Sequence, residues 1–112
     1  MKLIIAVIKP FKLDEVRVAL TAIGVRGMMV SEIKGFGAQS GHTEIYRGAE
    51  YAVNFVPKVK LEIVVSDAMA EQVVTTIALT AKTDKIGDGN IFPLAVEGAL
   101  RVRPGALNDD AL

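Results

Sequence analysis

The stretch from Thr83 to Asn90 has the residue types of a phosphate-binding loop. At its centre, Gly87 and Gly89 flank Asp88. Glycine lacks a Cβ, so the backbone can approach a ligand closely and direct N–H groups at an anion, and Lys85 adds a nearby positive charge. A tight turn is the simpler explanation of a Gly-Asp-Gly triplet, and the spacing is not that of a P-loop. The triplet alone leaves both interpretations open.

Two pairs of cationic side chains have a spacing that could also serve an anion. Arg101 and Arg103 form one pair, and Lys58 and Lys60 form the other. Side chains two residues apart project from the same face of an extended segment, and two guanidinium groups so placed can grip phosphate oxygens. Solvated charge on an ordinary polar face is the alternative for both pairs.

Aromatic and basic side chains gather in a long segment, 34–55, that shows neither helical nor strand periodicity. Loops longer than about 12–15 residues in compact domains are usually functional or disordered. Tyr46, Arg47 and Tyr51 suit docking into the pocket of a partner. His42 is the one histidine, and without a second histidine it is more typical of a spectator than of a nucleophile.

The composition limits the kinds of protein that can carry these groups. The chain has 112 residues, 51% of them hydrophobic, with 13 basic and 13 acidic side chains and no cysteine. We expect a single domain, 1–112, too small to enclose a large site within one subunit. Zero net charge argues against a nucleic-acid partner, and the absence of cysteine excludes thiol catalysis and suits the cytoplasm. The longest apolar run, Leu3–Ile8, is too short for a membrane helix.

Hydrophobic periodicity predicts the elements that position these groups. Leu3–Ile8 is apolar on both faces, as in a central strand, and strands also follow at 25–33, at 58–65 with alternating burial, and at 91–96, where Pro93 favours an edge. One helix follows Pro10 and ends at Gly24, and a second follows Asp67 as its cap. We expect its inner face to be Ala70, Val73, Val74, Ile77, Ala78 and Ala81, and the tail from Pro104 to be weakly structured.

The order β-α-β-β-α-β predicts an α+β, ferredoxin-like fold, with a four-stranded antiparallel sheet and both helices on one face. The two-sided apolar strand at Leu3–Ile8 then needs a second covering surface, and self-association is the economical way to supply it.

Several sequence blocks together resemble the PII nitrogen-regulatory signal proteins. They run in the same order over nearly the whole chain, from Lys9-Pro10-Phe11-Lys12 through Gly35-Phe36-Gly37, Tyr46-Arg47-Gly48-Ala49-Glu50-Tyr51, Phe55-Val56-Pro57-Lys58-Val59-Lys60 and Lys85-Ile86-Gly87-Asp88-Gly89 to Arg101-Val102-Arg103. The resemblance implies a ferredoxin-like homotrimer that binds adenine nucleotides in clefts between subunits. It also implies a T-loop at about 36–55, a B-loop at about 82–90 and a C-terminal loop at about 98–112.

The resemblance also implies roles for single residues. Gly87, Asp88 and Gly89 would hold phosphates, Arg101 and Arg103 would supply charge across the subunit boundary, and Glu62 and Val64 would lie near the ribose and base. Gln39 would coordinate Mg²⁺ beside 2-oxoglutarate, and Lys58 would pair with a carboxylate of that ligand. The full expected nucleotide set is Gly35, Gly37, Gln39, Glu62, Val64, Lys85, Ile86, Gly87, Asp88, Gly89, Asn90, Arg101 and Arg103.

The same resemblance points to partners. Arg47, Tyr46 and Tyr51 would contact a target, which in this family can be an ammonium transporter that recruits the protein to the membrane, or a metabolic enzyme. Tyr51 matches the tyrosine that a uridylyltransferase modifies, whereas Ala49 removes the serine that some members phosphorylate.

Departures from the family pattern concern the terminal phosphates. Ala38, Ser40 and Asn90 stand where the family commonly has basic residues, and Met29, Pro93 and Pro104 also differ. Each charge-assisted contact is worth about 1.5–3 kcal/mol, so two losses weaken the hold on a γ-phosphate. We therefore expect a preference for ADP or AMP over ATP and a weak response to 2-oxoglutarate; the alternative is conventional ATP and 2-oxoglutarate sensing.

Three classes of function remain to be compared. A non-catalytic nucleotide sensor needs no hydrolytic machinery and accounts for all the blocks. A small phosphate-handling enzyme on the same fold would use His42 or Asp88 as its reacting group. An RNA-binding module would need aromatic side chains on the strands and a basic surface, whereas Tyr46 and Tyr51 lie in the segment 34–55 and the net charge is zero.

Overall fold

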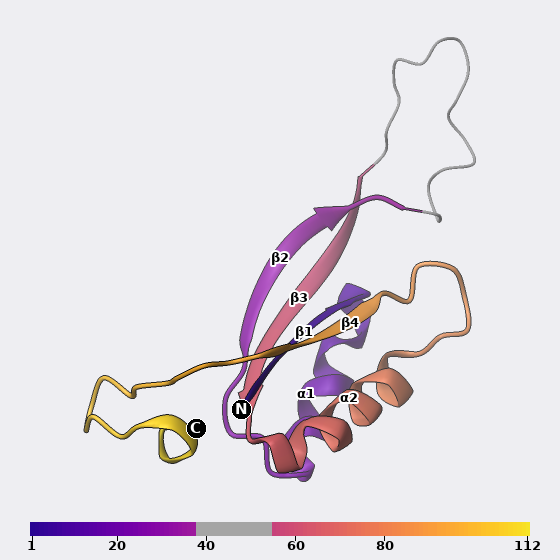
Figure 1. The fold of residues 1–112 in the computed structure, drawn as a ribbon. Helices are drawn as coiled ribbons and strands as arrows, with labels where there is room; N and C mark the ends of the chain where they lie inside the picture. Colours follow the sequence, from indigo (N-terminus) through magenta and orange to yellow (C-terminus); the bar gives the residue numbers. More distant parts are fainter. Residues whose placement is uncertain (38–54) are drawn as a thin grey trace, which may run out of the picture.

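The described part of the chain forms one four-stranded sheet and two α-helices (Figure 1). The computed structural model describes residues 1–37 and 55–112. The sheet order is β2-β3-β1-β4, with every neighbouring pair antiparallel, which confirms the predicted ferredoxin-like topology. The elements are β1 (Lys2–Ile8), α1 (Leu13–Ala22), β2 (Met29–Gly35), β3 (Val56–Val65), α2 (Asp67–Ala81) and β4 (Asn90–Ala95).

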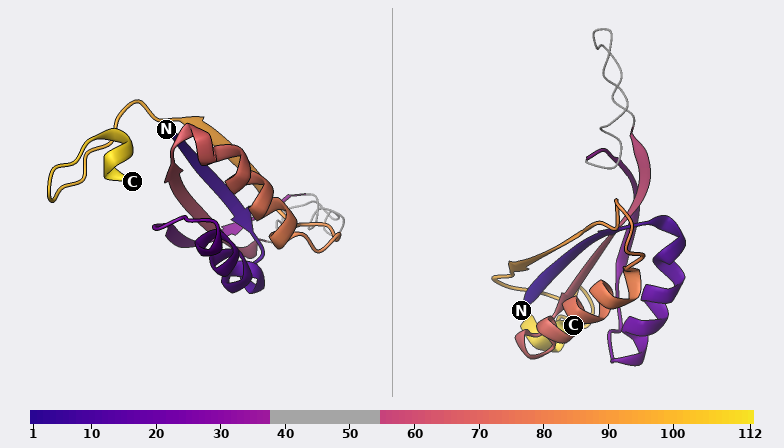
Figure 2. Two further views of the ribbon diagram at one scale, coloured as in Figure 1. Left: turned by 90° about the horizontal axis from the view of Figure 1, so that it is seen from below. Right: turned by 90° about the vertical axis from the view of Figure 1, so that its right-hand side faces the viewer.

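The core lies between the sheet and the helices, which cover the same face of the sheet (Figure 2). Ile4, Ala6 and Ile8 of β1 are fully buried there, and alternate residues of β3 from Val59 to Val65 join them. Val16 and Leu20 of α1 and Val73, Ile77 and Ala81 of α2 supply the helical side. The predicted inner face of the second helix is therefore largely confirmed, with the exception of Ala78, which is exposed.

The opposite face of the sheet is apolar and open in the single chain. Leu3 and Ile5 of β1 point there and are only half-buried. They pair with Leu94 and Phe92 of β4, which are 44% and 51% exposed. Residues directly opposite on neighbouring strands share a face, so these four side chains form one surface. The prediction that β1 is interior and apolar on both sides is confirmed.

Local signals explain most element boundaries. Gly24 follows the end of α1, as expected, and the Gly24 N–H donates to the Thr21 carbonyl (3.0 Å). Pro93 lies on β4, an edge strand of the sheet, which confirms the predicted edge position. Phe36 and Phe55 meet edge to face, 5.4 Å between ring centroids, just beyond the last paired residues of β2 and β3.

Three predictions about local structure are wrong. β2 begins at Met29 rather than at Val25, because Val25 donates its N–H to Leu20 at the helix end and packs into the core. Asp67 is the first residue of α2, after Ser66, and binds the Met1 amino group (2.9 Å) instead of capping the helix. The tail forms a 3₁₀ helix at Asn108–Ala111.

Within residues 1–37 and 55–112, no helix is both long and apolar enough to cross a membrane. Nor do three acidic or histidine side chains gather in that part of the chain to hold a metal ion.

Several residues with predicted roles lie outside the described residues: Ala38, Gln39, Ser40, His42, Tyr46, Arg47, Ala49 and Tyr51.

Candidate functional site

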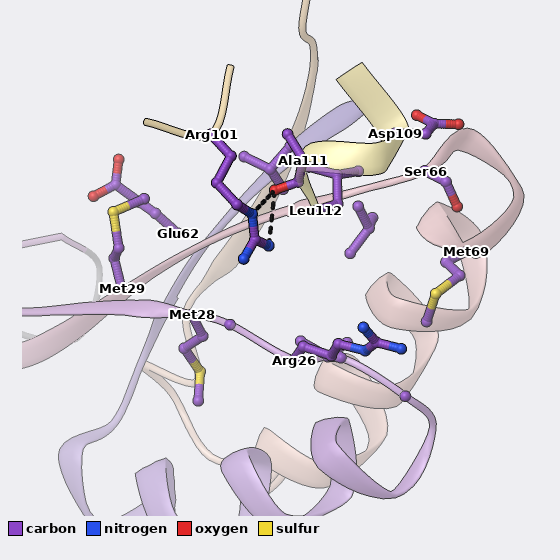
Figure 3. Close-up of a pocket in the computed structure, with 15 residues that line it drawn as sticks. Arg26, Met28, Met29, Glu62, Ser66, Met69, Arg101, Asp109, Ala111 and Leu112 are labelled. Carbon is purple, nitrogen blue, oxygen red and sulfur yellow. Dashed lines mark hydrogen bonds between the residues drawn. The ribbon is translucent and has the colours of Figure 1, made fainter. Parts of the chain in front are cut away.

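A groove of about 740 Å³ opens where the start of β2 meets the end of β3 and the C-terminal tail (Figure 3). Its walls come from segment 24–29, from β3 and the first turn of α2, and from the tail around Arg101 and Leu112. Glu62, Val64 and Arg101, three residues predicted to meet a nucleotide, line it together.

Glu62 and Val64 reach the groove because of the strand period. Alternate residues of β3 from Lys58 to Val64 lie on the face away from the helices, whereas Leu61 and Ile63 are buried in the core. Met29 is the direct partner of Glu62 across the β2–β3 pair. Glu62 also lies 3.9 Å from the Lys60 ammonium, in a partly exposed ion pair.

Arg101 is held in the groove by the tail itself. Its Nε and Nη2 donate to the Ala111 carbonyl at 3.3 and 3.1 Å, and its backbone N–H donates to the Ala106 carbonyl at 2.7 Å (Figure 3). The 3₁₀ helix that ends the tail is thereby folded back over Arg101. The C-terminal residues, which the sequence indicates to be weakly structured, thus position a cation.

Arg103 does not share this position. The segment after Arg101 is a turn rather than an extended strand, so the condition that would place Arg101 and Arg103 on one face is not met. Arg103 does not line the groove, whereas Arg101 does. Their action across a subunit boundary stays a prediction.

The loop 82–90 is held together by the carboxylate of Asp88. That carboxylate accepts hydrogen bonds from the Thr83 N–H (2.7 Å), the Asp84 N–H (2.9 Å) and the Thr83 hydroxyl. The Lys9 ammonium lies 3.4 Å from it. The Thr83 bonds, with those of Asp84 and Lys9, hold the pKa of Asp88 well below its ordinary value. The hydrogen bonds of the Asp88 carboxylate therefore stabilise the conformation of the loop itself.

Gly89 must be glycine for two reasons. Its φ is +105°, and a Cβ at this position would lie 1.7 Å from the Val7 carbonyl oxygen. The loop backbone therefore runs directly against the end of β1. Gly87 also has a positive φ, of +92°.

Lys58 ties the same loop to β3. Its side chain is buried, at 8% exposure, and its ammonium donates to the Gly87 carbonyl. Burial, together with repulsion from Lys9, lowers the pKa of Lys58, while Asp88 opposes this shift. Of the two lysines on this strand face, Lys58 is thus not a solvated charge, whereas the partly exposed Lys60 is paired with Glu62.

The remaining predicted residues fall around this loop. Gly35 lies beside Lys58, because a Cβ on Gly35 would sit 4.0 Å from the Lys58 Cγ. Ile86 is 70% exposed, and Asn90 begins β4. Gly37 is the last described residue before position 55. Lys9 and Thr83, which bind the Asp88 carboxylate, are not among the predicted site residues. The five-residue spacing between Thr83 and Asp88 is the one sequence feature that could have indicated their contact.

The structure thus places the predicted site residues in two groups. Val64 pairs with Leu3 near the start of β1, whereas Gly89 lies against Val7 near the end of β1. None of the described residues of the loop 82–90 lines the groove around Glu62 and Arg101. A single chain carries both halves of the predicted site but does not join them.

Comparison with known proteins assigns the family. The family model "Nitrogen regulatory protein P-II" matches residues 1–106. Proteins named nitrogen regulatory protein P-II from Rhizobium etli and Haemophilus influenzae are 56% and 58% identical to the chain. The nitrogen regulatory protein P-II 1 of Escherichia coli K12 is also 58% identical. All three alignments cover 112 residues and the full length of both chains. The chain therefore belongs to the nitrogen regulatory protein P-II family.

Proposed function

We propose that this regulator of the P-II family is a non-catalytic sensor of adenine nucleotides that acts on a target in nitrogen metabolism. Nucleotide would bind in clefts between the subunits of a homotrimer, with the loop 82–90 on one side and the groove around Glu62 on the other. Occupancy would bias the segment 36–55 between conformations that engage or release the target.

One observation carries this proposal: the two halves of the site lie apart in the chain but on the same sheet face. Lys58, next to the loop 82–90, and Val64, in the groove, occupy the two ends of one face of β3. That face continues into the open apolar surface of Leu3, Ile5, Phe92 and Leu94. Packing copies of this surface together would bring the loop of one subunit toward the groove of the next.

The loop 82–90 would favour a nucleotide with fewer phosphates than ATP. Gly87 and Gly89 allow a close approach of the backbone to the ligand, and Lys85 adds charge. Asn90 brings no charge to the end of the loop, and Ala38 brings none to the segment before Gln39. We therefore propose that ADP and AMP bind better than ATP.

Other effectors and partners follow from the family. Gln39 would hold Mg²⁺ through the nucleotide, and Lys58 would meet a carboxylate of 2-oxoglutarate. Arg47, Tyr46 and Tyr51 would contact an ammonium transporter or a metabolic enzyme, with Tyr51 open to uridylylation. The protein would work in the cytoplasm and reach the membrane only through its partner.

Calorimetric titration of ADP tests the binding site. Wild type should bind one ADP per chain, and Arg101→Ala should bind it about tenfold or more weakly, as expected for the loss of a charge-assisted contact. Arg17→Ala, an equal change of charge at an exposed position of α1, is the matched control and should bind like wild type. Equal affinities in Arg101→Ala and wild type would contradict the proposed site.

An assay of phosphate release separates this proposal from the enzyme alternative. A sensor should turn over neither ADP nor ATP. Turnover that is abolished by His42→Ala or Asp88→Ala would replace the proposal with a phosphate-handling enzyme.

A further inference from the structure

Three of the four methionines of the chain line a single groove. Met28, Met29 and Met69 lie on its walls, together with Glu62 and Arg101 (Figure 3). Thioethers are polarisable and adapt to flat ligand surfaces, but they are also the side chains that peroxide converts to sulfoxides. The groove therefore combines a ligand surface with oxidisable atoms.

Met29 differs from the other two in its surroundings. Met28 and Met69 are partly buried and pack against the hydrophobic core. In the single chain Met29 is 58% exposed, and it is not among the residues that pack there. Oxidation follows exposure, so a diffusible oxidant should reach the Met29 sulfur first.

Because Glu62 lies beside Met29, oxidation of Met29 would change the polarity of the groove wall. Met29 and Glu62 are directly opposite each other on β2 and β3, and their side chains extend from the same part of the groove wall (Figure 3). A thioether is a weak acceptor, whereas a sulfoxide carries a strongly polar oxygen that only accepts hydrogen bonds. A sulfoxide would therefore add a second acceptor beside the Glu62 carboxylate, which already faces the Lys60 ammonium on its own strand.

We infer that Met29 is a reversible oxidation site that lowers the affinity of the groove for nucleotide. This inference rests on the proposed function for its effect on binding, but not for the identity of the reactive residue. In the reaction, a lone pair of the sulfur attacks one oxygen of hydrogen peroxide, an S–O bond forms and the O–O bond breaks. The sulfur loses two electrons, and the peroxide is reduced to water. A thiol-dependent sulfoxide reductase would return the two electrons.

The first arm of the test measures which methionine reacts. The full chain is treated with limiting hydrogen peroxide, and peptide mass spectrometry follows sulfoxide at each methionine with time. Met29 should oxidise several-fold faster than Met28 and Met69, and saturating ADP should slow it. Equal rates at the three positions would overturn the inference, whatever the protein binds.

The second arm measures the effect on binding. Wild type oxidised at Met29 should bind ADP about tenfold more weakly, the order expected for an unsatisfied acceptor at a ligand contact. A mixture of the two methionine sulfoxide reductases, one for each sulfoxide epimer, should restore the affinity. Met29→Leu should have the same ADP affinity before and after peroxide treatment, whereas Met69→Leu should show the loss seen in wild type. Unchanged binding after full conversion of Met29 would overturn the inference.

The two arms keep the inference and the proposed function distinguishable. If untreated protein binds no ADP, the proposed function fails, and the affinity half of the inference fails with it. If untreated protein binds ADP and Met29 sulfoxide binds it equally well, the proposed function stands and the inference alone fails.

Discussion

At the scale of single residues, the loop 82–90 depends on side chains that point inward. Asp88 accepts two backbone hydrogen bonds and one hydroxyl hydrogen bond, and Lys58 donates to the Gly87 carbonyl. Neither the Asp88 carboxylate nor the Lys58 ammonium is therefore a free charge on the surface. Their shared effect is to fix the backbone of Gly87 and Gly89, so that the shape of the proposed anion site would be set before a ligand arrives.

Asp88→Asn should therefore destabilise the protein in a pH-dependent way. The folded-state pKa of Asp88 is lowered, so its carboxylate stabilises the fold above the unfolded-state pKa of about 3.9 and loses this effect as the pH falls below it. In urea unfolding, the difference in free energy of unfolding between wild type and Asp88→Asn should be largest near neutral pH and shrink toward pH 3.

Asp84→Asn provides the matched control for this prediction. Its side chain is 77% exposed and pairs with Lys82, at 3.3 Å, so its replacement should cost less than about 1 kcal/mol at any pH. A difference between wild type and Asp88→Asn that stays constant from neutral to acid pH would contradict the inward role of the Asp88 carboxylate.

These residue roles are only partly predictable from the sequence. The glycines and Asp88 of the loop are visible as a motif, but the burial of Lys58 is not, because strand period places it on the same face as the partly exposed Lys60. Its burial comes from the loop 82–90, which returns to β3 from 29 positions further along the chain. A contact over that distance leaves no local signal.

At the scale of elements, the end of β1 and the start of β4 leave room for only one residue type at position 89. Gly89→Ala combines a strained φ with a Cβ that would overlap the Val7 carbonyl oxygen, so the backbone must shift. We expect a loss of about 3 kcal/mol or more in urea unfolding, together with weaker ADP binding.

Gly105→Ala separates strain from overlap. Gly105 has a similar φ of +91°, but a Cβ added there would meet no described atom within 4 Å, so its replacement should cost about 1–2 kcal/mol. Equal losses in the two variants would show that backbone strain alone, and not the close approach to Val7, explains the requirement for glycine.

The elements also show where periodicity succeeds and where it fails. The alternation in β3 and the inner face of α2 follow directly from burial, since each element has one face in the core. The pattern places the start of β2 four residues early because Val25 is apolar for a different reason: it closes the end of α1. The tail lacks a pattern because its 3₁₀ helix is held by Arg101 rather than by a buried face.

At the scale of the whole molecule, the open sheet face predicts self-association. Leu3, Ile5, Phe92 and Leu94 form an apolar surface opposite the helices, and such a surface is typical of an interface between subunits. The resemblance to the P-II family implies three subunits, so sedimentation equilibrium should give wild type three times the mass of one chain.

Phe92→Asp should break this assembly, because it places a charge on the apolar surface. Leu79→Asp is the control, since Leu79 is 71% exposed on α2, a helix that covers the other side of the sheet. Phe92→Asp should sediment as a smaller species and lose ADP binding, whereas Leu79→Asp should remain a trimer. Dissociation of both variants, or a monomeric wild type, would contradict a trimer built on the open face.

The central claim concerns which nucleotide the proposed site binds most tightly, and direct calorimetry of the wild-type protein tests it. ADP, AMP and ATP are titrated separately, and ATP again with Mg²⁺ and 2-oxoglutarate. Because Ala38 and Asn90 would leave the γ-phosphate without two charges in the proposed site, ADP should bind more tightly than ATP, and the added effectors should not reverse this order. ATP binding at least as tight as ADP binding, and tightening further with Mg²⁺ and 2-oxoglutarate, would contradict the account.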